Sequence, residues 1–250
     1  MLEFCRREWT SLLTALAFLT RLGPARCLDA AALSRAVRYY PVAGLAAGVA
    51  QTLPAAVLML AHPAWGAGAA WLYVAAGFAV TRGLHWDAVA DMGDAWGSGA
   101  SGPAFWRILK DSRMGAYGAM SLLLTFSLEL LCAAVLCAAA DWGALCLAPA
   151  WGRACGVILA GSAAPHAAGS LGALACTGAG GAVRAFWLAL GLCAAVLLLP
   201  PVPAVSLVLA SLALVGGLRR LARRQGGLNG DFLGAAMLWG ECLALCAACL

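Results

Sequence analysis

The feature of this sequence that most restricts its fold is the run of residues 39–81, which contains no Asp, Glu, Lys or Arg. An Ala-His-Pro break at 61–63 divides the run into two apolar segments, 42–61 and 65–81. An α-helix needs roughly 20 mostly apolar residues to cross a hydrocarbon core about 30 Å thick. The two segments are therefore predicted to be transmembrane helices.

Further apolar windows follow along the chain and predict more spans. Residues 10–20 could form either a further span or an interfacial or re-entrant segment. The Gly-rich segment 163–183 is predicted to be a loop. The sequence thus predicts an all-α fold, a polytopic integral membrane helix bundle of about six to seven transmembrane helices that forms one domain over residues 1–250. The remaining predicted spans are 116–139, 143–162, 185–199, 203–218 and 232–250.

Composition agrees with a membrane protein and excludes several other classes. Hydrophobic residues make up 64% of the chain and charged residues 11%, against roughly 45–50% and about 25% in an ordinary soluble domain. So few charges cannot cover a water-facing surface. The formal charge of +5 is spread in short patches, which does not make the basic groove of a nucleic-acid-binding protein. We expect a lipid bilayer as partner and no nucleic acid, and a homo-oligomer is compatible with the sequence.

The positions of the basic residues predict the orientation in the membrane. Every Lys and Arg except Arg153 falls within 1–41, 82–115, 163–184 or 219–231. Because cytoplasmic loops are enriched in Lys and Arg, these four segments are predicted to lie on the cytoplasmic side.

Acidic residues gather beside the second predicted span. Asp87, Asp91, Asp94 and Asp111 fall within 25 residues of one another. The first three are spaced i, i+4 and i+7, which places them within an arc of roughly 60° on one helix face. A divalent cation would relieve their repulsion, and oxygen ligands favour a hard ion such as Mg²⁺. The alternative is a solvated acidic face or acids that favour a helix N-terminus.

A cationic stretch follows the acids and leads into the third predicted span. Arg107, Lys110 and Arg113 could hold phosphate oxygens, and Gly115 and Gly118 would permit close backbone approach. Basic residues at a cytoplasmic helix end are also ordinary topology signals. Beside the carboxylates, the pattern favours metal-assisted transfer between phosphorylated substrates.

Other polar residues lie at or inside the later spans. The Asn-Gly-Asp sequence at 229–231 is typical of a turn and helix N-cap. Glu241 is costly in lipid and should be paired within the bundle, with Arg153 as a possible partner. Glu129 requires a polar partner or a water-lined position. Such residues also occur in transporters, which remain an alternative, although the polar residues concentrate on one face of the membrane.

The chain resembles the cobalamin synthase family, the adenosylcobinamide-GDP ribazoletransferases. The resemblance covers nearly the whole chain and is most specific in the Gly-Leu-His-Trp-Asp motif and the acids that follow it. The segments that carry the resemblance are 18–21, 40–44, 83–94, 110–118 and 230–235.

The resemblance implies an Mg²⁺-dependent membrane transferase that completes the nucleotide loop of a corrinoid. Such an enzyme joins adenosylcobinamide-GDP to α-ribazole, or to its 5′-phosphate, and releases GMP. It further implies a location in the bacterial cytoplasmic (inner) membrane, with the active site facing the cytoplasm. A membrane alcohol phosphotransferase of another kind is an alternative, but its Asp-Gly-x-x-Ala-Arg element is not matched by 87–91.

The resemblance also implies roles for individual residues. His85 is a candidate general base, yet a helix through 85–87 turns it about 160° away from Asp87, and an acidic residue is an equal candidate. The expected metal ligands are Asp87, Asp91 and Asp94. The expected catalytic residues are His85, Asp91, Asp94, Asp111 and Asp231. The expected substrate-binding residues are Arg21, Arg107, Lys110, Arg113, Gly115 and Gly118.

The sequence departs from the family pattern at four positions. Ala88 replaces a common Gly, and Asn229 replaces a frequent Thr. His166 and Ala168 stand where the family often has Tyr and Arg, so a substrate contact from that arginine is in doubt.

Overall fold

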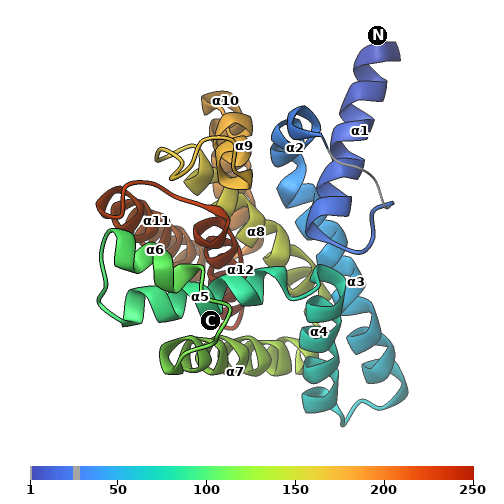
Figure 1. Ribbon diagram of the computed structural model, residues 1–250. Coiled ribbons are helices and arrows are strands. Elements are labelled where there is room, and N and C mark those ends of the chain that lie inside the picture. Colours follow the sequence, from blue (N-terminus) through green and yellow to red (C-terminus); the bar gives the residue numbers. More distant parts are fainter. Residues whose placement is uncertain (1, 25–28) are drawn as a thin grey trace.

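A computed structural model of this chain describes residues 2–24 and 29–250 (Figure 1). Within these residues no strand forms, and the one β-type contact is an isolated bridge between Pro165 and Leu228. The elements in order are α1 (Leu2–Leu19), α2 (Ala30–Ala36), η1 (Val37–Tyr39), α3 (Tyr40–Ala61), α4 (Gly66–Thr81), α5 (Leu84–Gly97), α6 (Pro103–Leu109), α7 (Ala116–Ala138), α8 (Trp142–Ala160), α9 (Leu171–Gly178), α10 (Gly181–Leu198), α11 (Pro201–Arg224) and α12 (Gly230–Ala248).

The predicted membrane bundle is confirmed. In the part of the chain that the structure describes, six helical stretches are long and apolar enough to cross a membrane: 30–61, which joins α2, η1 and α3, and the helices α7, α8, α10, α11 and α12. The apolar helix α4 coincides with the predicted span 65–81. Its 16 residues are fewer than those of any of the six candidate spans.

Two segments outside the confirmed spans contain helices. The predicted loop 163–183 is wrong in part because it contains α9, whose N-cap Ser170 accepts a hydrogen bond from the main-chain N–H of Ala173 at 3.2 Å. Residues 10–20 belong to the longer helix α1, which begins at Leu2 and is not among the candidate spans, so the interfacial or re-entrant position stays a prediction. In both places a short or charge-bearing helix is stabilised by its cap or its neighbours, which apolar length alone does not reveal.

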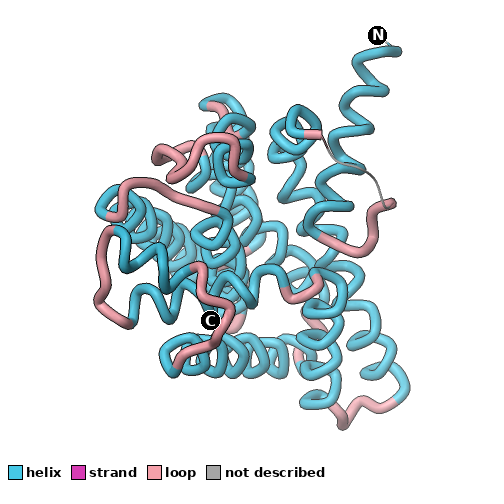
Figure 2. Tube along the Cα trace, viewed as in Figure 1, coloured by secondary structure: helices cyan, strands magenta, loops and turns pink. Residues whose placement is uncertain are grey.

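Helix α12 lies in the middle of the bundle and packs against α5, α7, α8 and α11 (Figure 1). Most of its residues are buried. Helix α8 completes the centre by packing against both α12 and α3. Figure 2 shows short connections between most of these helices, which suits antiparallel neighbours.

The segments predicted to lie on the cytoplasmic side meet one another at the same end of the bundle. Residues from each of the four segments contact residues from another, which supports their assignment to a single side. The hydrogen bonds that join them run from Arg82 Nη2 to Phe18 O (2.8 Å), from Gly102 N to Gln225 Oε1 (2.8 Å) and from Leu228 N to Ala164 O (3.0 Å).

Candidate active site

A sharp corner between α4 and α5 sets the position of the acidic stripe. Arg82 (φ 58°) and Gly83 (φ 68°) both adopt the left-handed conformation. The N–H of Gly83 donates to Phe78 O at 3.0 Å and closes the last turn of α4. Helix α5 begins at the next residue, Leu84, so the predicted helix through the acids is confirmed and it includes His85.

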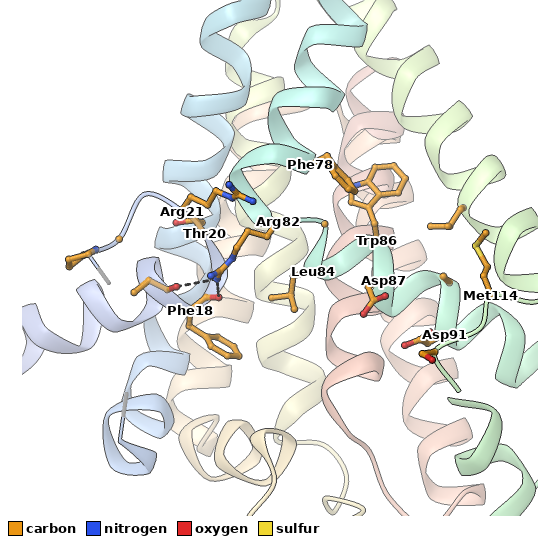
Figure 3. A pocket seen from close by; sticks show the side chains of 17 residues that line it. Phe18, Thr20, Arg21, Phe78, Arg82, Leu84, Trp86, Asp87, Asp91 and Met114 are labelled. Atoms are coloured by element: carbon orange, nitrogen blue, oxygen red, sulfur yellow. Dashed lines mark hydrogen bonds between the residues drawn. The ribbon is translucent and has the colours of Figure 1, made fainter. Parts of the chain in front are cut away.

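Two of the three acids on this helix face a cavity of about 1030 Å³ (Figure 3). Asp87 and Asp91 both line it, and Asp87 is exposed whereas Asp91 is half-buried. The other walls come from the end of α1 and the segment after it, from α4, and from the segment that leads into α7. The cavity is therefore built from the segments that gather at one end of the bundle.

Asp91 carries the clearest electrostatic signature in the cavity. Burial, together with the negative charges of Asp87, Asp231 and Asp94, raises the pKa of its carboxyl to about 7. Asp231 belongs to the first turn of α12 and accepts a hydrogen bond from the Asn229 amide at 2.7 Å. The structure therefore brings the distant Asp231 near the acids of α5, where its predicted role needs it.

Asp94 is turned toward the protein. Its two carboxylate oxygens accept the main-chain N–H groups of Gly115 and Gly118, at 2.6 Å and 2.7 Å. Gly115 is the N-cap residue of α7, so Asp94 caps that helix from a neighbouring one. The close backbone approach predicted at the two glycines is present, and what approaches them is the Asp94 carboxylate. A Cβ built on Gly115 would lie 2.5 Å from Asp94 Oδ1.

His85 points into the bundle and away from the cavity. It is 2% exposed, and its Nδ1 lies 3.4 Å from Arg153 Nη2. Burial and the adjacent guanidinium lower the pKa of His85 well below its ordinary value. Arg153 in turn pairs with Glu241, as predicted, and Gln51 Nε2 donates to the same carboxylate at 3.1 Å. His85 thus joins a buried polar network and does not face the carboxylates.

The basic residues of the cationic stretch, from Arg107 in α6 to Arg113, are exposed, and part of the stretch borders the cavity. Asp111 and Arg113 form a two-pronged ion pair, at 2.7 Å and 3.0 Å, that keeps the pKa of Asp111 near 2. Arg107 and Lys110 are exposed and do not line the cavity, whereas Ser112 from the same stretch does.

The donor set fits Mg²⁺ that also draws ligands from substrate. Among the described residues, no three His, Cys, Asp or Glu side chains lie close enough to hold a metal ion by themselves. Mg²⁺ commonly takes one or two carboxylates together with water and substrate phosphates. Asp87 and Asp91 can supply that pair, and their oxygen-only chemistry suits a hard ion.

The cavity also has a basic and aromatic part that motif analysis did not assign. Arg21, which the sequence predicts to bind substrate, lines it together with Arg82, Phe78 and Trp86. In Figure 3 Arg21 and Arg82 lie on one side of the cavity and Asp87 on the other. Arg82 immediately precedes the Gly83 motif in the sequence, and its charge there predicts only the orientation of the loop in the membrane.

The four departures from the family pattern lie in different surroundings. Ala88 faces α12, where a Cβ built on Gly234 would lie 2.5 Å from the Ala88 Cβ. Asn229 is the N-cap of α12. The His166 ring stacks on the Trp106 indole with centroids 3.6 Å apart, and Ala168 is exposed in the loop that follows.

A helical bundle of this length and apolarity, with an acidic cavity at one end, defines a polytopic membrane enzyme. The family model described as cobalamin-5-phosphate synthase matches residues 11–249. The chain belongs to this family, whose members are transferases of cobalamin biosynthesis.

Curated relatives agree over almost the full length. The chain is 45% identical over 237 residues to an adenosylcobinamide-GDP ribazoletransferase of Nitratidesulfovibrio vulgaris strain DP4, covering 94% of this chain and 96% of that one. It is 39% identical to the protein of that name from strain Miyazaki F, covering 95% and 94%, and 36% identical to one from Sinorhizobium sp, covering 94% of each. No solved structure matches the chain significantly. The family decides against a transporter and against a phosphotransferase of another kind.

Proposed function

We propose that this protein transfers the adenosylcobinamide phosphoryl group from adenosylcobinamide-GDP to α-ribazole or its 5′-phosphate and releases GMP. The observation that carries the proposal is the cavity that Asp87 and Asp91 share with Arg21 and Arg82. It offers carboxylates for a metal, cations for phosphate and an aromatic wall in one space. The proposal agrees with the names of the relatives, adenosylcobinamide-GDP ribazoletransferases.

In the proposed step, a ribose hydroxyl oxygen of the acceptor bonds to the phosphorus on the cobinamide side of the diphosphate. The bond from that phosphorus to the bridging oxygen breaks, and GMP leaves with the electron pair. Mg²⁺, held by Asp87 and Asp91, would supply charge neutralisation at the diphosphate. The protein itself mainly positions the two substrates and excludes water from the reacting atoms.

The hydroxyl proton passes to a carboxylate close to the metal ligands. Asp231 is better placed than His85, because its charge acts on Asp91 whereas His85 lies in the buried network with Arg153. Asp94 would act by holding the start of α7 against α5.

We further propose that the chain lies in the bacterial cytoplasmic membrane with the cavity toward the cytoplasm. The gathering of all four Arg-bearing segments at one end supports this orientation. A cysteine at Gly99, which is exposed after α5, should react with an impermeant maleimide only in permeabilised cells. The parent protein is the control because it carries exposed cysteines of its own, and extra labelling of intact cells would contradict the orientation.

The decisive test uses the purified protein in liposomes with adenosylcobinamide-GDP, α-ribazole or its 5′-phosphate, and Mg²⁺. We expect a cobalamin product and one GMP per turnover, and no turnover when EDTA removes the metal. The same preparation carrying Asp91→Asn should insert normally and be inactive. Failure of the wild-type protein to form product with either acceptor would refute the proposed function.

A further inference from the structure

The cavity has two ends of opposite charge. Asp87 and Asp91 occupy one end, and Arg21 and Arg82 occupy the other (Figure 3). Leu84 and Asp91 are seven helical residues apart, or about 10 Å of rise, and Arg82 lies beyond Leu84. A group bound between the two arginines is therefore separate from one held at Asp91.

The two arginines are free to bind an anion. Within the described residues neither forms an ion pair with an acidic side chain. Both are exposed. One terminal nitrogen of Arg82 donates to Ala17 O at 3.2 Å and to Phe18 O at 2.8 Å, which anchors the side chain. Its other nitrogens make no hydrogen bond within that part of the chain and remain available.

The backbone holds Arg82 in this place at a cost. It has φ 58°, a conformation in which a residue with a Cβ is strained by about 1 kcal/mol or more. The conformation turns the chain from α4 into α5 and brings the guanidinium to the end of α1. A strained, anchored arginine at the wall of a cavity is typical of a binding position.

The space between the charged ends fits an aromatic ring. Phe18, Phe78 and Trp86 line the cavity together with both charged pairs. The total volume of about 1030 Å³ is at the upper limit for a single small-molecule site, roughly 300–1,000 Å³. There is room for the diphosphate at the acidic end and for an aromatic nucleoside that extends toward the arginines.

Building on the proposed function, we propose that Arg21 and Arg82 form a phosphate subsite for the acceptor nucleoside and make the enzyme prefer the 5′-phosphate over the free nucleoside. Arginine suits this task because its planar fork binds phosphate oxygens in pairs. The metal end then receives the donor diphosphate, and the basic end sets which acceptor is used.

The test measures kcat/KM for ribazole 5′-phosphate and for ribazole, with saturating donor and Mg²⁺, in liposomes of phosphatidylcholine alone. We expect the ratio of the two values to fall at least tenfold in Arg21→Gln and in Arg82→Gln. Arg82→Lys should retain part of the preference because charge remains and the fork is lost. Arg219→Gln, an exposed arginine of α11 outside the cavity, is the matched control and should keep the wild-type ratio.

Each other outcome has a definite meaning. Equal losses with both acceptors, or an unchanged ratio, would overturn the subsite. Arg21→Gln keeps the test informative if Arg82→Gln fails to fold, because the Arg21 side chain makes no hydrogen bond within the described part of the chain. Adding phosphatidylglycerol should leave the ratio unchanged, whereas a ratio that falls in the wild type and not in the variants would assign the arginines to lipid headgroups. Absence of product with both acceptors in the wild type would instead refute the proposed function itself.

Discussion

The Asp94 carboxylate accepts the main-chain N–H of Gly118 at 2.7 Å. The same carboxylate accepts the N–H of Gly115 at 2.6 Å, so a side chain of α5 caps the helix that begins at residue 116. The start of α7 is thereby tied to the helix that carries Asp87 and Asp91. The three acids of α5 share one helix face, but their surroundings differ. Asp87 and Asp91 face the cavity, whereas Asp94 binds the backbone N–H groups at the start of α7.

Replacing Gly118 by Ala should lower activity at least tenfold. A Cβ at this position would overlap the Asp94 carboxylate and lie 2.8 Å from Ala90 O, so α5 and α7 must move apart. The measurement is product formation per folded protein. Gly216→Ala is the control because a Cβ there meets nothing within 4 Å, and equal activities of the two variants would contradict the predicted coupling.

Asp91→Asn and Asp94→Asn should fail in different ways. Asp91→Asn should lose turnover by at least 100-fold and keep its thermal stability in detergent, because it removes a charge and no hydrogen bond of the fold. Asp94→Asn should be destabilised by about 1–3 kcal/mol, since its amide retains only one acceptor oxygen for two N–H groups. Thermal unfolding and turnover measured on the same samples separate the two effects. The control is Glu3→Gln, because Glu3 is exposed and far in the sequence from the acids of α5. This variant should change neither turnover nor thermal stability.

Removal of Glu241 should destabilise the bundle strongly. Glu241→Ala leaves Arg153, which is 3% exposed, without its ion-pair partner, and such losses cost about 3–5 kcal/mol. The double variant Arg153→Met with Glu241→Leu should recover most of that stability because both charges of the pair are removed and neither is left without its partner. Unfolding in detergent measures both. A double variant no more stable than Glu241→Ala would show that this ion pair is not the main source of the loss.

Affinity for Mg²⁺ should depend on pH through Asp91. The pKa of this carboxyl in the metal-free protein is about 7, so below that pH a proton occupies the group and the metal must displace it. The apparent dissociation constant should therefore rise by up to about tenfold per pH unit below 7 and level off above it. Calorimetric titrations between about pH 6 and pH 8 measure this slope. A slope of equal size in Asp91→Asn would assign the titration to another group.

The buried network illustrates where sequence-based inference stopped. An Arg and a Glu inside apolar spans had to be paired, because an isolated charge in lipid is too costly, and this argument correctly joined Arg153 to Glu241. The same argument could not place His85 in the network, since residue 85 belongs to the acidic motif in the sequence. Only the packing of α5 against α12, which brings the His85 ring to Arg153 of α8, decided that the ring points into the bundle.

The segments outside the spans also show what the sequence predicts and what it does not. Apolar length and Arg positions predicted the spans and the common side of the loops, since crossing lipid imposes length and polarity on each helix separately. They did not predict α9, because a short helix stabilised by a cap and neighbours leaves no signal of length.

By itself, the sequence determined that this chain spans a membrane as a helical bundle, which residues carry the family motifs, and that its acids share one helical face. Those properties are local, since each depends on the composition or period of one segment. Tertiary structure decided which acids reach the cavity, that Asp94 caps α7, that Asp231 joins Asp87 and Asp91, and that Arg21 and Arg82 share one wall. Such relationships depend on how helices far apart in the chain pack together, because the partners of a side chain are set by its neighbours in space.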